Sequence, residues 1–284
     1  MAKDLSAIAG LPDSSSMVQS SLEQTAKNLR ILLLGAPKGG KTVMLASLSE
    51  FFPETVPAAT MTHLKDGLII QFDSGGCDSL APLNLSVPCI DLSRCTDEAS
   101  LIQGYNNAAL ILKKRVESGE TTWAAVDGLS TFDKMLKNTL MSRLEKWPLY
   151  DAMLGHHMKF FQKLQALAID LAFACHAKGL GTLDDKLDEG AGRARREASA
   201  LPGGATIAAD ITGQALSYYR GQMSLILPVI ATKAGKNAKT DYAVYPNGMN
   251  GFEAGTRFPL NDKEPPNLNK LLRKIRGLNN KQGE

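Results

Sequence analysis

The stretch ILLLGAPKGGKT at residues 31–42 constrains the fold more than any other part of the chain. Its last eight residues match the pattern G-x-x-x-x-G-K-[ST], with the lysine and threonine at Lys41 and Thr42. Glycines let backbone N–H groups wrap a phosphate chain, the lysine neutralises phosphate oxygens, and the threonine hydroxyl is placed to bind Mg²⁺. The apolar strand before the motif and the helical sequence TVMLASLSEFF after it supply the required strand–loop–helix context. Lys38 is expected to be a solvated or phosphate-flanking charge. The residues expected to bind the nucleotide are Gly35, Ala36, Pro37, Lys38, Gly39, Gly40, Lys41, Thr42 and Val43.

Short apolar runs alternate with helical patterns along the rest of the chain. The expected strands cover residues 31–35, 67–73, 123–127, 169–175, 223–231 and 241–246, and the expected helices cover 42–52, 99–117, 131–145 and 150–168. The first four strands are short and apolar, which is typical of strands buried on both faces of a parallel sheet. This order predicts an α/β fold with a mainly parallel central sheet flanked by helices. Residues 233–240 join the last two strands as a hairpin-like turn, so this late pair is expected to be antiparallel.

We expect one domain between two polar tails. The chain has 284 residues, 44% of them hydrophobic, which suffices for one large core. Residues 1–28 are polar and serine-rich and are expected to form a flexible arm, and residues 276–284 a polar tail. Residues 178–205 combine glycine with mixed charge and show no apolar period, which indicates a mobile loop inside the domain of residues 29–275.

Composition excludes several classes of protein. No apolar run is long enough to span a membrane and no signal segment opens the chain, so we expect a cytoplasmic protein without a membrane partner. A net charge of +3 is too small to indicate nucleic-acid binding by itself. The four cysteines lack C-x-x-C spacing and are expected to be reduced, mostly buried thiols rather than zinc ligands. They are Cys77, Cys89, Cys95 and Cys175.

Polar side chains at the ends of three expected strands supply the rest of the predicted site. Asp127 ends a buried strand and is expected to help hold the metal, with capping of the next helix as the alternative. His176 follows a strand expected beside those of the phosphate loop and Asp127, where it would sense the γ-phosphate or the attacking water; a structural role remains open. Asp73 would orient or deprotonate water, with Asp78 as the other available acid and plain turn chemistry as the alternative.

Three further side chains carry expectations of their own. Lys41 is expected to be exposed before any ligand binds, so its removal would open no core cavity. His156 and His157 lie in the middle of an expected helix, and we interpret both as structural.

Several motifs together resemble the phage RecA-like ATPases. They are GAPKGGKT, AAVDGLST, WPLYDAMLGHHMKFFQKL before LAFACHAK, LPGG, and the later GTRFPL. This family comprises short, single-domain nucleotide-binding proteins that accompany phage recombination and single-strand annealing. The resemblance covers residues 29–275 and implies a RecA-like P-loop NTPase fold with ATP and Mg²⁺ as cofactors. It also implies Thr42 and Asp127 as metal ligands, Lys41 as a catalytic residue and His176 as the γ-phosphate sensor.

The chain departs from the family's pattern at the residue that is expected to act as the catalytic base. The second strand of RecA-like proteins commonly ends Asp-x-Glu, whereas here the tripeptide is Asp73-Ser74-Gly75, so Asp73 is the candidate stand-in and the hydrolysis rate is open. The family also completes each active site from a neighbouring subunit, through basic residues on the late hairpin. The candidates for this role are Lys233, Lys236 and Arg257.

The leading hypothesis is an ATP-hydrolysing phage recombination protein that acts on single-stranded DNA as a homo-oligomer in the bacterial host cytoplasm. A phage single-strand binding or annealing protein would be a further partner. The DNA-binding candidates are Arg193, Arg195 and Arg196, although their loop is also acidic and lacks an aromatic residue, so a solvated loop remains the alternative. A nucleotide-switched assembly or scaffold protein with little or no hydrolysis is the second hypothesis. A helicase or packaging motor is the third, and no accessory domain favours it.

Overall fold

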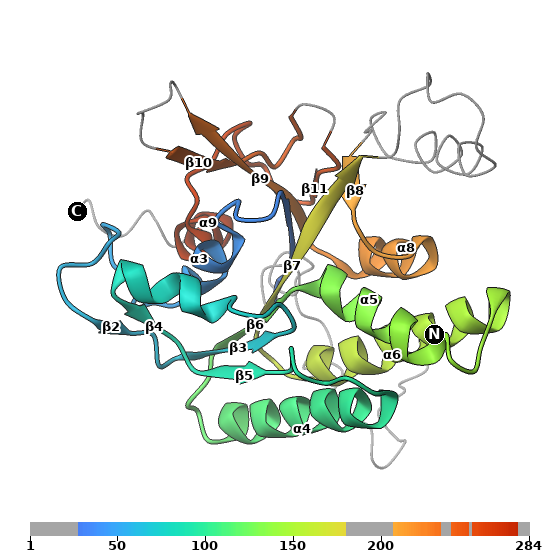
Figure 1. Ribbon diagram of the computed structural model, residues 1–284. Helices are drawn as coiled ribbons and strands as arrows, with labels where there is room; N and C mark the ends of the chain where they lie inside the picture. The colour runs from blue at the N-terminus through green and yellow to red at the C-terminus, as the bar shows by residue number, and fades with distance from the viewer. Residues whose placement is uncertain (1–27, 180–206, 234–239, 250–251, 278–284) are drawn as a thin grey trace, which may run out of the picture.

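The computed structural model describes residues 28–179, 207–233, 240–249 and 252–277 (Figure 1). The strands are β1 (Arg30–Gly35), β2 (Thr62–His63), β3 (Gly67–Gln71), β4 (Leu85–Ser86), β5 (Cys89–Asp91), β6 (Trp123–Asp127), β7 (Asp170–Gly179), β8 (Ile207–Ala209), β9 (Leu225–Lys233), β10 (Thr240–Val244) and β11 (Gly255–Thr256). The helices are α3 (Lys41–Ala46), the 3₁₀ helix η1 (Cys77–Leu83), α4 (Glu98–Glu117), α5 (Leu129–Leu140), α6 (Lys146–Gln165), α8 (Gly213–Gln222) and α9 (Leu268–Ile275).

One large sheet organises the described part of the chain. Its strand order is β10-β9-β1-β7-β6-β3-β5, with β11 beside β9 and β8 beside β7. The six strands from β9 to β5 run parallel, whereas β10, β11 and β8 pair antiparallel with their neighbours. The predicted fold class is therefore confirmed: a mainly parallel central sheet flanked by helices, with a late antiparallel pair. The expectation that the strand leading to His176 lies beside those of the phosphate loop and Asp127 is also confirmed, since β7 lies between β1 and β6.

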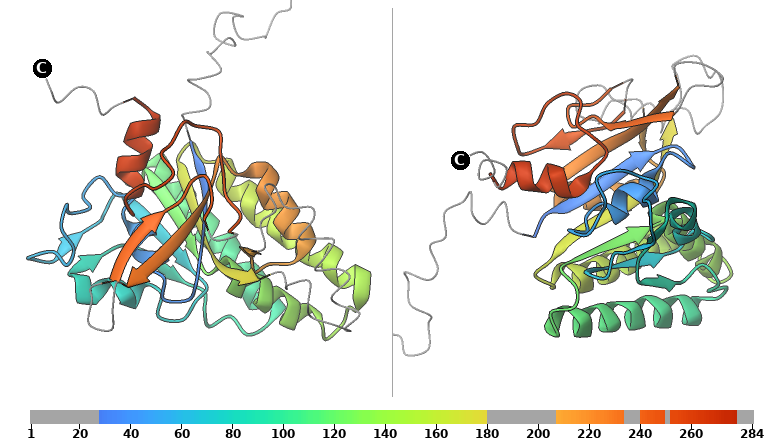
Figure 2. Two further views of the ribbon diagram at one scale, coloured as in Figure 1. Left: turned by 90° about the horizontal axis from the view of Figure 1, so that it is seen from above. Right: turned by 90° about the vertical axis from the view of Figure 1, so that its left-hand side faces the viewer.

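Alternating residues of the buried strands face two separate apolar layers. Leu32 and Leu34 of β1 face the helices α4, α5, α6 and α8, whereas Ile31 and Leu33 face α3, α9 and η1. Figure 2 shows α5, α6 and α8 on one side of the sheet and α9 on the other. Such two-sided burial explains why these strands read as continuous apolar runs. No helix in the described ranges has the length and apolar character needed to cross a bilayer.

Helix α3 is shorter than the expected helix 42–52. Its α-helical part ends at Ala46, and tighter turns continue the chain. The Ser47 hydroxyl donates to the Met44 carbonyl (2.6 Å) and accepts from the Leu268 amide of α9 (2.8 Å). The end of α3 is thus fixed by a helix more than two hundred residues later, a contact that local periodicity does not report.

Strand β7 is longer than expected and includes His176 rather than ending before it. Its last residues pair with β8, in the register Ala177↔Ala209 and Gly179↔Ile207. This pairing satisfies backbone groups that would otherwise end the strand. Helix α5, in turn, ends at Leu140, and α6 begins at Lys146, so the expected boundaries 131–145 and 150–168 both move towards the N-terminus.

The expectation of mostly buried cysteines is wrong. Cys175 is buried, but Cys77 and Cys95 are only half-buried and Cys89 is exposed, and all four are free thiols. Cys89 begins β5, which is the edge strand of the sheet and has a neighbour on one side only. An edge strand leaves part of its side chains in solvent, which a count of apolar residues does not reveal.

A buried polar network joins α5, α6 and α8. His157 is 0% exposed, its Nε2 lies 2.9 Å from the Asp133 carboxylate, and its Nδ1 lies 3.3 Å from the Tyr219 hydroxyl. The same carboxylate accepts from the Thr212 amide (3.2 Å) and hydroxyl (3.1 Å) at the start of α8. The neighbouring His156 contacts the Tyr105 hydroxyl (3.0 Å). Both histidines therefore sit in helix-packing contacts, in line with the structural role expected for them.

Candidate nucleotide-binding site

The phosphate-loop motif forms the turn between β1 and α3. Gly40 has φ +80° and Lys38 has φ +60°, and the Gly39 amide donates to the Ala36 carbonyl (3.0 Å). A Cβ atom on Gly39 would lie 2.8 Å from that carbonyl oxygen, and one on Gly40 would lie 2.9 Å from the ring of Tyr242 in β10. The glycines are thus required by backbone conformation and by close approach. The late antiparallel pair also packs directly on the loop.

Lys41 lies across its own loop. Its Nζ donates to the carbonyls of Gly35 (3.0 Å) and Ala36 (2.8 Å), and the side chain is only 7% exposed. The expectation of an exposed lysine is therefore wrong, because the curled loop offers two carbonyl acceptors within reach. Burial lowers the pKa of Lys41, while the nearby Asp127 carboxylate raises it.

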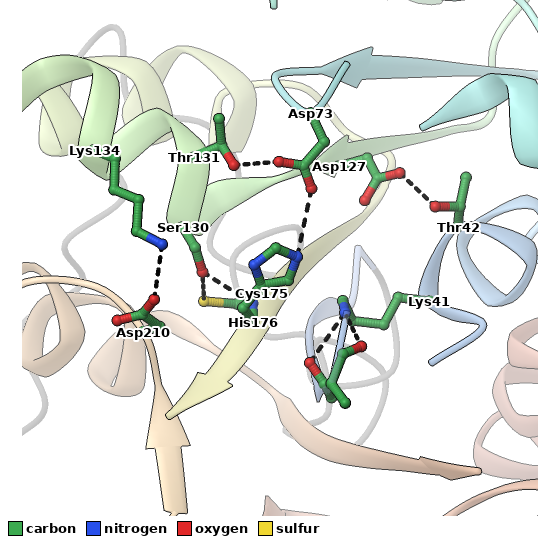
Figure 3. A network of polar contacts seen from close by, with 12 residues as sticks. Lys41, Thr42, Asp73, Asp127, Ser130, Thr131, Lys134, Cys175, His176 and Asp210 are labelled. Carbon is green, nitrogen blue, oxygen red and sulfur yellow. Dashed lines mark hydrogen bonds and ion pairs between the residues drawn. The ribbon is translucent and has the colours of Figure 1, made fainter. Parts of the chain in front are cut away.

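Thr42 and Asp127 meet where α3 begins and β6 ends. The Thr42 hydroxyl donates to Asp127 Oδ2 at 2.6 Å (Figure 3). Asp127 is 3% exposed, and burial raises the pKa of its carboxyl against the lowering effect of this hydrogen bond. A hydroxyl oxygen beside a carboxylate is a donor set that suits Mg²⁺, a hard cation that prefers oxygen. The two residues predicted to hold the metal therefore fit that role in chemistry and in placement.

Asp73 and His176 face one another next to this pair. Asp73 follows β3 and accepts a short hydrogen bond from the Thr131 hydroxyl, and its Oδ2 lies 3.7 Å from His176 Nε2 (Figure 3). The His176 amide donates to the Ser130 hydroxyl at 2.9 Å. Burial, and next the charge of Lys41, lower the pKa of His176. The imidazole is therefore neutral at neutral pH and can accept or donate a hydrogen bond.

The parallel register explains why these groups converge. Gly35 pairs with His176 across β1 and β7, and Asp127 pairs with Ala174 across β6 and β7. The carboxyl ends of three neighbouring strands therefore reach the same edge of the sheet, where open α/β sheets bind their ligands. The structure thus brings together the four predicted catalytic side chains: Lys41, Asp73, Asp127 and His176. Asp78, the other acid considered for water activation, lies beyond them in η1.

Among the remaining candidates, only Arg257 has a described side chain, and it lies away from this cluster. Arg257 is exposed after β11. Burial, and next the charge of Arg257, lower the pKa of Arg30, which begins β1 at the end of the sheet opposite the phosphate loop. Lys233 ends β9, paired with Thr240, and nothing is described of its side chain. Lys236 and the three DNA-binding candidates, Arg193, Arg195 and Arg196, lie outside the described residues.

Sequence reasoning missed three side chains of the site. Thr131, near the start of α5, donates a hydrogen bond to Asp73. Lys134 Nζ lies 3.1 Å from Asp210 Oδ2. After the larger effect of burial, the charges of both side chains also shift the pKa of His176. Tyr242 packs on Gly40. The spacing of Thr131 and Lys134 on the helix after Asp127 was a usable signal, because residues three apart share a face; nothing local marks Tyr242.

No protein-family model matches the chain, and no curated protein matches it either. Among solved structures, it is similar to a KaiC-like protein from the hyperthermophilic archaeon Pyrococcus horikoshii, with 11% identity, a TM-score of 0.40, and coverage of 85% of this chain and 88% of that one. It is also similar to an ATPase from the type III secretion system of pathogenic bacteria, with 8% identity, a TM-score of 0.41, and coverage of 72% of this chain and 51% of that one. Both likenesses are distant, and what this chain can do follows from its own residues.

Proposed function

We propose that this chain binds ATP together with Mg²⁺ at the phosphate loop and hydrolyses it. The observation that carries the proposal is the Thr42–Asp127 contact of 2.6 Å beside the Lys41 ammonium, at the mouth of a glycine loop. A hydroxyl, a buried carboxylate and a lysine in this order supply the groups that a magnesium–triphosphate requires. A turn that served the fold alone would not need two buried charged side chains beside it.

Each side chain has a defined task in nucleotide binding. When the nucleotide binds, the Lys41 ammonium releases the carbonyls of Gly35 and Ala36 and donates to phosphate oxygens instead. Because both carbonyls belong to the same loop, the exchange stays within that loop. Thr42 and Asp127 hold the metal, which supplies positive charge that offsets the charge on the phosphates. In this proposal, backbone N–H groups of the loop orient the phosphate chain.

Hydrolysis requires a group that orients water and accepts its proton. We assign this task to Asp73, whose carboxylate is fixed by Thr131 and lies 3.7 Å from His176. The neutral His176 imidazole then hydrogen-bonds the attacking water or the γ-phosphate. Aspartate is one methylene shorter than glutamate, so its reach towards the γ-phosphate is shorter and slow basal turnover follows.

The resemblance to the phage RecA-like ATPases supports a more specific role. We propose that the protein acts on single-stranded DNA during phage recombination, as a homo-oligomer in the host cytoplasm. The exposed Arg257 lies far from its own phosphate loop along β1, which makes it available to a neighbouring subunit rather than to its own site. Lys233 and Lys236 are the other candidates for this role in trans, and Arg193, Arg195 and Arg196 are assigned to the DNA backbone.

The test is steady-state ATP turnover, measured with and without single-stranded DNA, together with native mass. We expect turnover that requires Mg²⁺, rises with DNA and accompanies a mass of several subunits. Nucleotide binding without turnover under every condition would favour the scaffold hypothesis instead. Failure to bind ATP at all would overturn the proposal.

The shared active site has a separate test by mixing. A Lys41→Ala subunit and a Lys233→Ala/Lys236→Ala subunit each lack a different half of the proposed site. Mixed together, they should regain part of the turnover, because some interfaces then contain both intact halves. No recovery in a preparation that co-assembles would contradict a site shared between subunits.

A further inference from the structure

Two cysteine thiols lie in contact beside the candidate site. The sulfur atoms of Cys77 and Cys89 are 2.9 Å apart, although the residues are separated by a 3₁₀ helix and a short strand. Cys77 begins η1 and is half-buried, whereas Cys89 begins the edge strand β5 and is exposed. No residue of the proposed hydrolysis reaction needs either thiol, so the pair calls for its own explanation.

We propose that Cys77 and Cys89 form a reversible disulfide under oxidation, which ties the loop carrying Asp73 to the edge strand β5. A disulfide needs a sulfur–sulfur distance of about 2.0 Å, so the two sulfurs must approach by less than one atomic radius. Disulfides in reducing compartments are typically transient and redox-sensing, which suits a pair whose Cys89 is exposed at a sheet edge.

The oxidant is hydrogen peroxide, and the step balances without any further reactant. The Cys89 sulfur attacks one peroxide oxygen, the O–O bond breaks, and one water leaves as the sulfenic acid forms. The Cys77 sulfur then attacks the Cys89 sulfur, the S–O bond breaks, and a second water leaves. Both thiol hydrogens end in water, the peroxide is reduced, and the two sulfurs are oxidised to the disulfide.

The environment decides the order of these events. Cys89 is exposed and so meets the oxidant first. The hydrogen bond with Cys89, together with burial, raises the pKa of Cys77, which keeps that thiol protonated until its partner has reacted. Burial likewise raises the pKa of Cys175 to about 12, which leaves that thiol inert.

The position of the pair connects it to the catalytic groups. The Cys77 amide donates to Gln71 Oε1 at 2.8 Å, and the Cys89 thiol lies 3.6 Å from the same atom. Gln71 pairs with Asp127 across β3 and β6, and a Cβ atom on Gly76 would lie 2.9 Å from Asp127 Oδ2. The disulfide therefore draws the segment after Asp73 towards β5 and away from Asp127. The resulting fall in turnover rests on the proposed ATPase function, whereas formation of the bond does not.

The experiment treats the full-length protein with hydrogen peroxide, alkylates free thiols and digests with a protease that cleaves before aspartate. Asp73, Asp78 and Asp91 then place Cys77 and Cys89 in separate peptides, residues 73–77 and 78–90. We expect these two peptides to be joined, lighter by two hydrogen atoms, and released by dithiothreitol. Cys89→Ser should abolish the joined species, and the matched Cys95→Ser variant should leave it unchanged.

Turnover and hydrogen exchange supply the second readout. Oxidation should slow exchange in residues 72–84 and remove most of the turnover in the parent and in Cys95→Ser, but not in Cys89→Ser. Peroxide that converts Cys89 to sulfinic acid without joining the peptides would overturn the proposal. Joined peptides with unchanged exchange would overturn the restraint on the loop. A protein that forms the disulfide but never hydrolyses ATP would count against the proposed function and leave the redox site standing.

Discussion

Two buried polar clusters lie close to helix α5 and differ in kind. On one side, Asp133 has its carboxylate oxygens engaged by His157 and Thr212, all within the chain. On the other side, near the start of the helix, Asp127 is equally buried, but among the described residues its carboxylate has only the Thr42 hydroxyl as a hydrogen-bond partner. The carboxylate of the first cluster is hydrogen-bonded on both oxygens, whereas that of the second is hydrogen-bonded on one oxygen among the described residues.

The difference separates a structural network from a functional one. A buried charge without full compensation costs stability, so a fold keeps one only where something else depends on it. Lys41 and Asp127 are both buried, yet the lysine bonds backbone carbonyls and the aspartate bonds a hydroxyl. Each of these weak partners can be exchanged for a phosphate oxygen or a metal ion, which is what the proposed function requires.

The largest expected effect is on ligand binding. Lys41→Ala should weaken ATP binding by about 1,000-fold, because two charge-assisted hydrogen bonds to phosphate are lost. A fluorescent ATP analogue measures this loss on the folded protein. Lys137→Ala is the matched control, since Lys137 is an exposed lysine outside the loop. Equal affinity in Lys41→Ala and the parent would refute the phosphate site.

The next effect is on catalysis alone. Asp73→Asn should reduce kcat by about 100-fold with ATP affinity nearly intact, because a water-orienting group acts mainly in the transition state. The amide keeps an oxygen that accepts from Thr131, so the loop should stay in place. Asp78→Asn tests the other nearby acid and should have little effect. Equal loss of affinity and kcat in Asp73→Asn would assign Asp73 to the metal or to structure.

The structural cluster should respond in the opposite way. Asp133→Ala leaves His157 and Thr212 without their buried acceptor and should lower the free energy of unfolding by about 2 kcal/mol. ATP affinity of the folded protein should be unchanged. Urea denaturation with Asn138→Ala as an exposed control on the same helix measures the difference. A loss of ATP affinity without a loss of stability would erase the distinction between the two clusters.

The smallest effect is a gain in stability at the functional cluster. The folded-state pKa of Asp127 is raised above 3.8, so the folded state binds this proton more tightly and stability falls as pH rises through the folded pKa. Asp127→Asn should therefore raise the melting temperature of the unliganded protein by a few degrees, about 1 kcal/mol or less, at neutral pH. The gain should vanish below pH 3.8, where the carboxyl is protonated in both states. A destabilised Asp127→Asn at neutral pH would show that this charge serves the fold.

The sequence pattern was sufficient to predict the parallel sheet and the meeting of strand ends at the candidate site. The apolar runs that end at Gly35 and Asp127, and the run that leads to His176, predicted parallel strands. The carboxyl ends of parallel strands lie at the same edge of a sheet. The pattern did not reveal that Lys41 folds back onto its own carbonyls, because that contact depends on the curl of the loop.

Contacts between separate segments could not be predicted from the sequence, for a physical reason. Ser47 bonds Leu268, Tyr242 covers Gly40, and Cys77 touches Cys89, and each of these pairs depends on how the sheet aligns separate strands and turns. Local periodicity records which face of an element is apolar, but not which segment lies against it. The extra length of β7 has the same origin in its pairing with β8.

Calorimetric titration of ATP into the unmodified protein, with and without Mg²⁺, tests the central claim most directly. Because Thr42 and Asp127 are proposed to hold the metal beside the phosphates, binding should be saturable, with one nucleotide per chain, and should weaken by at least about tenfold when Mg²⁺ is removed. Adenosine, which lacks phosphates, should not compete. Saturable binding that is indifferent to Mg²⁺, or the absence of any binding heat with ATP and Mg²⁺ at several temperatures, would contradict the account.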